Sequence, residues 1–471
     1  MLHSSLQALI LAAGKSTRFS TARTKLSFPL CGQELLAFPL QLLGELKIPT
    51  TLILGYQKEV LLPLIERYMP SAQWIDQLEQ KGTGHAVLCT KDTWHADHIL
   101  VLNGDVPLLR LEDLKTLIQK HITTGAAISC IAAYNMDPSL KGYGRFISDE
   151  THVSIVEERD FKGDPAEHCR INAGIYLFKR TFLERALPSL TVHPTHGELY
   201  ITDLIKKASD EGEHIELVDA PFEYVRGVNT LEELWIAEHI KKSQIVRSFL
   251  RQGVRFIAPE SVAIDVDVTI GSDSCIGYGV QLRSGTMIGT NVTIDAFSVL
   301  DKALIGNNVV VKSHSVISSS TLHKQSVVGP FAHIHNQSIL EEQSVVGNFV
   351  EVTKSSLGKG TKAKHLAYLG NAHIGSSVTM GAGSITCNYN GVTKHVTTIN
   401  DNAFIGTNVS LIAPVTVGEG AVVAAGSTIT VNVPAHALAI AREHQTNKEQ
   451  YAPLLKERYR TMSQPPSEKV L

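Results

Sequence analysis

The hydrophobic pattern of the chain changes near residue 230. Before that point, short apolar runs typical of β-strands alternate with segments in which apolar residues recur at helical spacing. The expected strands are Gln7–Leu11, Thr51–Leu54, His98–Leu102, Ala127–Ala132 and Ile175–Phe178. The expected helices are Leu35–Leu46, Glu59–Tyr68 and Leu111–His121. This alternation predicts an α/β, Rossmann-like domain over residues 1–229, with a largely parallel sheet and ligands at the carboxyl ends of its strands.

Residues 230–252 form a different kind of segment, rich in charge and free of turn residues. Leu231, Leu234, Ala237 and Ile245 recur at helical spacing, which predicts one long helix. Because it lies between two different periodicities, we interpret it as a linker.

From Val262 onward an aliphatic residue recurs every six positions. The first block is Ile264, Ile270, Ile276, Leu282, Ile288 and Ile294, and the last is Ile399, Ile405, Leu411, Val417, Val423 and Ile429. Glycine often follows the aliphatic residue, and we expect this small residue to let the chain turn a corner. A six-residue period is typical of a left-handed parallel β-helix, here over residues 253–471. The break at Thr386–Thr398 predicts a loop leaving the coil, and the closing segment with Gln-Pro-Pro-Ser predicts a mobile tail.

Composition excludes several classes of protein. The 43 Lys and Arg residues against 46 Asp and Glu give a net charge of −3, which is unlike a non-specific nucleic-acid binder. The six cysteines are scattered without zinc-type spacing, so we expect reduced thiols and a cytoplasmic location. The first apolar run stops at Gly14 without a basic segment ahead of it, unlike a signal peptide, and no uncharged stretch is long enough to span a membrane.

Two polar segments follow expected strands and carry candidate phosphate chemistry. In Leu11–Lys25, Gly14 permits close backbone approach to a phosphate, while Arg18 and Lys25 can neutralise its charge. In Asn103-Gly104-Asp105, a carboxylate at a strand end suits Mg²⁺ bound to phosphates. Taken alone, each segment is a weak signal, and an ordinary turn that exposes charged residues to water is the more common explanation.

A series of motifs in one order resembles a known enzyme family. The motifs are LAAGKSTR…TK at 11–25, Gln77, GTGHA at 82–86, GD at 104–105, GYGR at 142–145, Glu157, INAG at 171–174, YITD at 200–203 and GVN at 227–229. This part resembles the pyrophosphorylase domain of the bacterial bifunctional N-acetylglucosamine-1-phosphate uridyltransferase/glucosamine-1-phosphate acetyltransferases. The hexapeptide half continues the resemblance, which therefore covers nearly the whole chain.

The resemblance implies a nucleotidyltransferase site in the first half. It implies that Arg18 and Lys25 are catalytic and contact the UTP phosphates, and that Asp105 and Asn229 hold Mg²⁺. The implied uracil contacts are Leu11, Ala12, Gly14, Gln77 and Gly82. The implied contacts to N-acetylglucosamine 1-phosphate are Thr83, Gly144, Glu157 and Asn172. Asn103 stands where the family usually has tyrosine and Ala173 where it usually has threonine, and both departures concern the fit of the sugar.

The resemblance implies a second site in the hexapeptide half, between subunits of a homotrimer. It implies that His365 is the general base that deprotonates the amine of glucosamine 1-phosphate, a task suited to imidazole. The implied acceptor contacts are Glu351, Tyr368, Asn388 and Tyr389. The implied acetyl-coenzyme A contacts are Ala382, Thr407, Ala425 and Arg442, of which Thr407 replaces a usual serine.

Three further departures concern the acceptor site. His333, Thr353 and Thr379 stand where the family has arginine, lysine and asparagine. The family's arginine and lysine hold the acceptor phosphate, and each such charge-assisted contact is typically worth about 1.5–3 kcal/mol. Lys354, Lys364 and a protonated His333 offer partial compensation without the fork of an arginine.

Three hypotheses follow from these observations. The first is a bifunctional enzyme that makes UDP-N-acetylglucosamine, a precursor of peptidoglycan and lipid A. The second is a uridylyltransferase alone, whose β-helix is a trimerisation scaffold or an acetyltransferase of altered acceptor specificity. The third is a non-catalytic regulatory or assembly subunit, against which the intact Arg18, Lys25, Asp105 and Asn229 argue.

Overall fold

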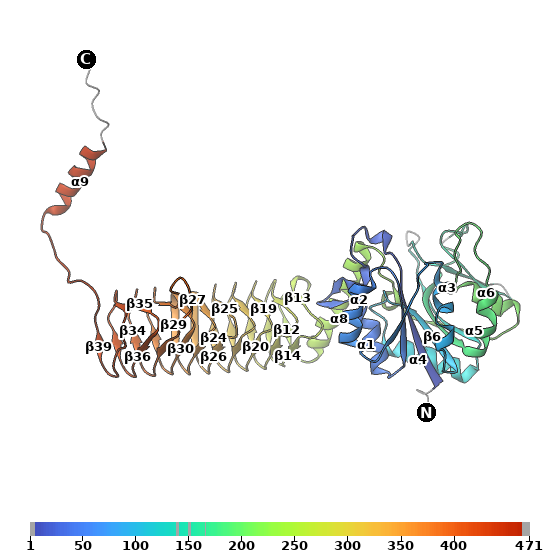
Figure 1. Ribbon diagram of the computed structural model, residues 1–471, viewed down its shortest axis with the longest axis horizontal. Helices are drawn as coiled ribbons and strands as arrows, with labels where there is room; N and C mark the ends of the chain where they lie inside the picture. The colour runs from blue at the N-terminus through green and yellow to red at the C-terminus, as the bar shows by residue number, and fades with distance from the viewer. Residues whose placement is uncertain (1–4, 138–140, 149–151, 165, 464–471) are drawn as a thin grey trace, which may run out of the picture. The chain divides into compact units, whose positions relative to one another are not determined.

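The computed structural model describes residues 5–137, 141–148, 152–164 and 166–463 (Figure 1). The chain divides into two compact units, one of residues 1–269 with 281–285 and the other of residues 270–280 with 286–471. Each unit is described by itself.

A nine-stranded mixed sheet forms the centre of the first unit, with the main order β11-β7-β10-β6-β1-β4-β5. The strands are β1 (Leu6–Ala12), β4 (Thr50–Leu54), β5 (Gln73–Asp76), β6 (His98–Asn103), β7 (Ile128–Tyr134), β8 (Arg145–Ser148), β9 (Val153–Val156), β10 (Arg170–Lys179) and β11 (Ile215–Asp219). All five expected strands are present. The neighbours β6, β1, β4 and β5 are parallel, as predicted for this part of the sheet.

One expected strand departs from the parallel arrangement. β10, which contains Ile175–Phe178, runs antiparallel to both β6 and β7. Before β10 the chain forms the antiparallel pair β8–β9, and β8 also pairs with β10. Antiparallel strands need no helical crossover, so this strand enters the sheet without the βαβ connection that the sequence pattern suggests.

Helices cover both faces of this sheet because successive side chains of each strand point to opposite faces. In β1, Ala8 and Ile10 belong to one buried cluster and Leu9 to another. The first cluster includes residues of α1 (Ala37–Glu45), α2 (Lys58–Tyr68) and α4 (Leu111–Thr124), the three expected helices. The second includes residues of α3 (Thr83–Leu88), α5 (Arg180–Ala186) and α6 (Asp203–Asp210).

The predicted long helix is present as α8 (Leu231–Arg251). It begins with a capping box, in which Glu233 N donates to Thr230 Oγ1 at 3.1 Å and Thr230 N donates to Glu233 Oε2 at 3.0 Å. Its Leu234 and Ala237 belong to one buried cluster with Phe19, which lies in the segment Leu11–Lys25.

The second unit is a left-handed parallel β-helix, seen in Figure 1 as a row of stacked coils. Strands β14 (Thr269–Ile270) to β26 (Ile339–Leu340) hold two or three residues each. Each aliphatic residue of the repeat is buried and pairs with its counterpart one coil later, as Ile276 does with Ile294 and Ile294 with Val311. Two longer strands, β27 (Val345–Thr353) and β29 (Lys362–Gly370), interrupt the regular pattern.

The repeat's glycines have a different role from the one the sequence suggested. A Cβ at Gly271 would lie 2.7 Å from the backbone of Gly289 on the next coil, and one at Gly306 would lie 2.9 Å from the backbone of Lys324. The left-handed corner lies two residues later, at Asp273 and Asn308, whose φ angles are 61° and 60°. These glycines therefore permit close stacking of coils, while other residues turn the corner.

Two predicted irregular segments have different outcomes. The loop expected at Thr386–Thr398 lies between β32 (Ile385–Cys387) and β33 (Thr397–Ile399), so both ends of the expected range belong to strands. Of the expected mobile tail, residues 464–471 lie outside the described residues, and α9 (Tyr451–Met462) precedes them without a buried residue. In the described part of the chain, no helix is long and apolar enough to cross a membrane.

The stacked core makes a testable distinction between two leucines of neighbouring strands. Leu300 is fully buried, whereas Leu304 is 45% exposed. We expect Leu300→Ala to destabilise the β-helix by about 2–5 kcal/mol because it leaves a cavity. Leu304→Ala, the matched control, should cost less than about 0.5 kcal/mol. Denaturant unfolding followed by circular dichroism measures both, and equal effects would contradict the assignment of the core.

Candidate functional site

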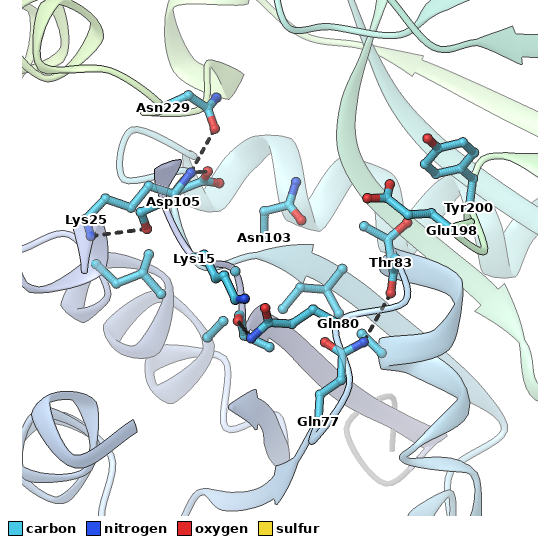
Figure 2. A pocket seen from close by; sticks show the side chains of 18 residues that line it. Lys15, Lys25, Gln77, Gln80, Thr83, Asn103, Asp105, Glu198, Tyr200 and Asn229 are labelled. Carbon is cyan, nitrogen blue, oxygen red and sulfur yellow. Dashed lines mark hydrogen bonds and ion pairs between the residues drawn. The ribbon is translucent and has the colours of Figure 1, made fainter. Parts of the chain in front are cut away.

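A pocket of about 580 Å³ opens where β1 and β6 end (Figure 2). A second pocket of about 170 Å³ shares Leu11, Thr83, Asn103, Asp105 and Asn229 with it. The first pocket is lined by the predicted residues Leu11, Ala12, Gly14, Lys25, Gln77, Gly82, Thr83, Asp105 and Asn229. The second adds the predicted residues Arg18, Gly144, Glu157 and Asn172. The fold therefore brings together every residue that the sequence assigned to the first site.

The centre of the first pocket is a cluster of four polar side chains. Lys25 Nζ forms an ion pair with Asp105 Oδ2 and donates to Asn229 Oδ1 at 2.8 Å. Arg18 Nη2 donates to the same Asn229 oxygen at 2.9 Å. Two basic side chains therefore converge on an acidic one and on one amide oxygen, beside an open cavity.

Backbone hydrogen bonds fix the three segments that supply this cluster. Gly104 N donates to Leu11 O at 3.0 Å, which joins the ends of β6 and β1. Val228 N donates to Asp105 O at 2.9 Å, which joins the end of β6 to the segment before α8. Asn229 N donates to Glu233 Oε2 at 2.7 Å, so the capped end of α8 also fixes Asn229.

The donor set of this cluster fits a hard divalent cation. Asp105 is 8% exposed, and its Oδ1 is buried without a hydrogen-bond partner in the described part of the chain. A buried carboxylate oxygen without a partner is costly unless a ligand satisfies it. Carboxylate and amide oxygens are the protein ligands that Mg²⁺ prefers.

The opposite end of the first pocket carries amide groups. Gln77 Nε2 donates to Gly82 O at 3.2 Å, and Gln80 Nε2 donates to Ala13 O at 3.0 Å. Gly82 has a φ of 96°, and a Cβ there would lie 2.5 Å from Leu199 O, so only glycine fits. This end is suited to a planar ring with hydrogen-bonding edges.

Polar side chains at fixed positions line the second pocket. Glu157 Oε1 accepts from Thr202 Oγ1 at 2.8 Å, and Asn172 Nδ2 donates to the Tyr176 hydroxyl at 2.6 Å. Burial raises the pKa of Glu157, and the hydrogen bond from Thr202 opposes that shift. Asn103 and Ala173, the two departures from the family pattern, both line this pocket.

Several pocket residues received no role from the sequence. They are Lys15, Gln80, Tyr143, Glu198, Tyr200 and Thr202. The hydroxyl of Tyr143 accepts from Gly227 N at 2.9 Å and so supports the segment that carries Asn229. Tyr143, Tyr200 and Thr202 belong to quoted motifs, and their place in those motifs is the signal that could have identified them.

In the second unit, strand register aligns three predicted acceptor residues. His333 pairs with Glu351, and Glu351 pairs with Tyr368, so the three lie side by side on successive coils. Thr379 instead pairs with Lys362, at the far end of β29 from Tyr368. Thr379 was predicted to belong to the same acceptor site. In the register of this chain it lies at the other end of β29 from Tyr368.

The predicted general base is exposed and has one polar partner. His365 Nδ1 lies 3.1 Å from Asn348 Oδ1 on the preceding coil.

Two predicted acceptor residues make polar contacts near the loop. Asn388 Nδ2 donates to Asn371 Oδ1 at 2.8 Å, and the hydroxyl of Tyr389 donates to Gly391 O at 2.6 Å. Asn388 and Tyr389 lie at the start of the loop that leaves the coil after β32.

The predicted coenzyme contacts follow one corner of the coil. Asn408 N donates to Ala382 O at 2.7 Å and Gly426 N donates to Thr407 O at 2.8 Å, so Ala382, Thr407 and Ala425 lie on successive coils. Arg442 follows the last strand and is exposed.

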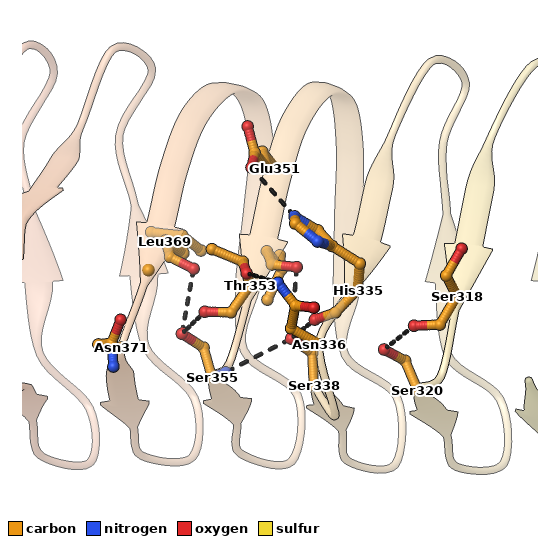
Figure 3. A network of polar contacts seen from close by, with 12 residues as sticks. Ser318, Ser320, His335, Asn336, Ser338, Glu351, Thr353, Ser355, Leu369 and Asn371 are labelled. Carbon is orange, nitrogen blue, oxygen red and sulfur yellow. Dashed lines mark hydrogen bonds and ion pairs between the residues drawn. The ribbon is translucent and has the colours of Figure 1, made fainter.

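Thr353, which replaces the family's lysine, belongs to a network of polar contacts that includes His335, Asn336 and Glu351 (Figure 3). His335 Nε2 lies 3.0 Å from Glu351 Oε1, and Asn336 Nδ2 donates to the buried Thr353 Oγ1 at 2.9 Å. Burial and the neighbouring His335 lower the pKa of His333. The lowered pKa of His333 argues against the expected compensation by a protonated ring.

The raised pKa of Glu157 predicts a pH effect on stability. The native state keeps the proton to higher pH than the unfolded chain, so this residue makes stability fall as pH rises above about 4.5. We expect Glu157→Gln to remove that loss and to be more stable than the wild type near pH 7, but not below pH 4.5. Thermal melting across pH measures the difference. The control is Glu66→Gln at an exposed site, and a parallel pH profile for both variants would contradict the assignment.

Models of protein families match three parts of the chain. The MobA-like NTP transferase domain matches residues 8–166, the GMPPB C-terminal domain matches residues 257–357, and the bacterial transferase hexapeptide (six repeats) matches residues 397–430. The first range contains Arg18, Lys25 and Asp105 of the polar cluster.

Curated relatives extend over almost the whole chain. The bifunctional protein GlmU of Exiguobacterium sibiricum is 40% identical over 456 residues, which cover 94% of this chain and 99% of that protein. GlmU of Thermotoga maritima is 38% identical and GlmU of Geobacter sulfurreducens 37% identical, each over 94% of this chain and 98% of the relative. The chain therefore belongs to the family of the bifunctional protein GlmU.

Proposed function

We propose that this chain makes UDP-N-acetylglucosamine in two steps, with each unit contributing one activity. In this proposal residues 253–471 transfer an acetyl group from acetyl-coenzyme A to glucosamine 1-phosphate. Residues 1–229 then transfer a uridylyl group from UTP to the product, and residues 230–252 link the two parts. Membership of a family of bifunctional transferases supports both activities. The observation that carries the uridylyltransferase activity is the cluster of Arg18, Lys25, Asp105 and Asn229 at the pocket.

The first pocket suits an in-line displacement at phosphorus. A phosphate oxygen of N-acetylglucosamine 1-phosphate attacks the α-phosphorus of UTP, the bond to the β-phosphate oxygen breaks, and pyrophosphate leaves. This step needs positioning and charge neutralisation more than a covalent partner. Arg18 and Lys25 supply positive charge beside the cavity, and their contacts to Asn229 hold them in place before substrate binds.

We assign Mg²⁺ to Asp105 and Asn229. The unsatisfied Oδ1 of Asp105 and the Oδ1 of Asn229 support this assignment. When bound, the cation neutralises phosphate charge in the transition state. A cation at Asn229 Oδ1 would release the hydrogen bonds that Arg18 and Lys25 donate to this oxygen, and both side chains would then be available to phosphate oxygens.

The two pockets divide the remaining substrate contacts. Gln77, Gly82 and the segment with Leu11, Ala12 and Gly14 contact uracil, because they line the end of the first pocket that carries amide groups. Thr83, Gly144, Glu157 and Asn172 contact the sugar in the second pocket. With Asn103 and Ala173 in that pocket, the sugar has more space than a tyrosine and a threonine would leave.

For acetyl transfer we assign His365 as the general base. The acceptor amine attacks the thioester carbonyl, His365 takes the proton from the nitrogen, and the coenzyme leaves as its thiol. Glu351, Tyr368, Asn388 and Tyr389 bind the acceptor, and Ala382, Thr407, Ala425 and Arg442 bind the coenzyme. The exposed His365 and the exposed corner support a homotrimer in which neighbouring copies enclose the site. The six free cysteines support a reducing, cytoplasmic compartment.

A second candidate keeps only the uridylyltransferase activity. The specific observation behind it is that Thr353 is buried and bonded to Asn336, while burial and His335 lower the pKa of His333. Thr353 therefore offers the phosphate no positive charge, and the charged form of His333 is disfavoured. In that case the β-helix assembles the trimer or acetylates an acceptor without a phosphate.

The nucleotidyltransferase proposal predicts a large effect at Asp105. We expect Asp105→Asn to lower kcat/KM for pyrophosphate release from UTP and N-acetylglucosamine 1-phosphate by about 10²–10³-fold, because it removes charge from the cation site. A coupled pyrophosphate assay with Mg²⁺ measures this. Asp97→Asn, at an exposed position outside the pockets, should keep wild-type activity. Equal activity of the two variants would refute the role of Asp105.

The acetyltransferase proposal predicts separable activities. We expect His365→Asn to lower thiol release from acetyl-coenzyme A with glucosamine 1-phosphate by about 10²–10⁴-fold, because it removes the general base. The same variant should keep full pyrophosphate release. His373→Asn, an exposed histidine on the next strand, is the matched control. Absence of thiol release by the wild type at millimolar acceptor would favour the second candidate instead.

A further inference from the structure

Three ligand-type side chains that the proposed chemistry does not use lie together in the first unit. His193 Nε2 is 3.7 Å from Asp160 Oδ2, and His196 Nε2 is 3.4 Å from Asp160 Oδ1. One ligand atom from each residue lies within 4.8 Å of those of the other two. Bonds of about 2.0–2.2 Å to a tetrahedral Zn²⁺ place its ligand atoms roughly 3.3–3.6 Å apart. Both His–Asp distances are therefore already close to those of a metal site.

A closed turn holds the two imidazoles on one side of the chain. Gly197 N donates to His193 O at 2.8 Å, and His193 N donates to Glu198 O at 2.8 Å. Gly197 has a φ of 69°, a left-handed conformation that glycine adopts without strain. The two rings are stacked, with centroids 5.0 Å apart and an interplanar angle of 14°. Both rings are thus held near one carboxylate without any bound ion.

The surroundings favour a cation at this place. His196 Nε2, the ring nitrogen that lies nearest Asp160, is a buried atom without a hydrogen bond to the described residues. A buried imidazole nitrogen without a partner requires an explanation, and a metal ligand is one. A second carboxylate, Asp203, lies in the same electrostatic environment. Its pKa is raised mainly by burial, and among its charged neighbours His193 lowers the pKa while Asp160 raises it.

We propose that His193, His196 and Asp160 form a binding site for Zn²⁺, separate from the Mg²⁺ site at Asp105. Imidazole nitrogens select zinc-like metals, whereas Mg²⁺ prefers an all-oxygen ligand set. The three protein ligands leave the fourth tetrahedral position for water.

The bound ion would brace one wall of the nucleotide pocket. Immediately after the turn, Gly84 N donates to Leu199 O at 2.8 Å and Ile201 N donates to Thr83 Oγ1 at 3.1 Å. Glu198 and Tyr200, which alternate with these bonded residues, line the pocket. Asp160 lies one turn after Glu157, since its N donates to Glu157 O at 3.0 Å. A metal joining the turn to Asp160 therefore links two segments that border the substrate.

The competing explanation is a pair of His–Asp ion pairs that bind no metal. To separate the two, the full chain without an affinity tag is titrated with ZnCl₂ in millimolar Mg²⁺ by isothermal titration calorimetry. We expect the double variant His193→Asn/His196→Asn to bind one equivalent of Zn²⁺ fewer than the wild type. This difference is unaffected by zinc bound at the other imidazole group, His333, His335 and Glu351, because both proteins share it. Equal stoichiometry in the two proteins would overturn the proposal.

Further variants and a second readout keep the test independent of folding and of activity. Asp160→Asn should bind this equivalent at least about tenfold more weakly, and His95→Asn, an exposed histidine, should match the wild type. In hydrogen exchange, Zn²⁺ should slow the amides of residues 193–200 in the wild type and leave them unchanged in the double variant, because the ion stabilises the closed turn. Melting curves without metal establish that the double variant is folded. Slowing in both proteins, or in neither, would also contradict the site.

Discussion

The first site depends on the ion pair between Lys25 and Asp105, two residues 80 positions apart in the sequence. Asp105 is almost fully buried, and a buried carboxylate that loses its partner typically costs about 3–5 kcal/mol. The pairing of Leu11 with Asn103 in the register of β1 and β6 brings the two residues to the same sheet edge. Arg18, Lys25 and Asp105 together carry a net positive charge, which favours the binding of a polyphosphate.

What the sequence could predict of this site was local in the chain. Arg18, Lys25 and Asp105 follow expected strands directly, so the rule that ligands bind at carboxyl ends of strands brings them together. Glu198 and Tyr200 could not be placed in the same way. They reach the pocket through tertiary hydrogen bonds from Leu199 and Ile201 to the segment around Thr83, and such bonds leave no periodicity in the sequence. The antiparallel direction of β10 could not be predicted either, because the hydrophobic pattern of a strand does not encode its direction.

The six-residue period of the β-helix could be predicted from the sequence, but the residues at its corners could not. Phe297, His314, Phe331 and Phe349 have φ angles of 58°, 59°, 53° and 55°, which cost a bulky residue roughly 1–2 kcal/mol each. Their rings stack in series on successive coils, with centroids 5.0–5.5 Å apart. The coil closes with the same geometry on each turn, so the stacked core holds every corner in the left-handed conformation and the aromatic contacts offset part of its cost. Glycine stands at other positive-φ positions of the coil, such as Gly285 and Gly420, so a rule that assigns every such corner to glycine fails here.

The two proposed sites differ in how completely a single chain can form them. At the first, the loops after β1 and β6 and the start of α8 enclose Lys25 and Asp105 within a single unit. At the second, one side chain per coil contributes along an open surface, and His365 remains exposed. Among the described residues of the second unit, the longest segment between two strands is residues 388–396, between β32 and β33. Excluding water from a general base on such a face requires another surface, and a second copy of the same chain is the simplest source of one.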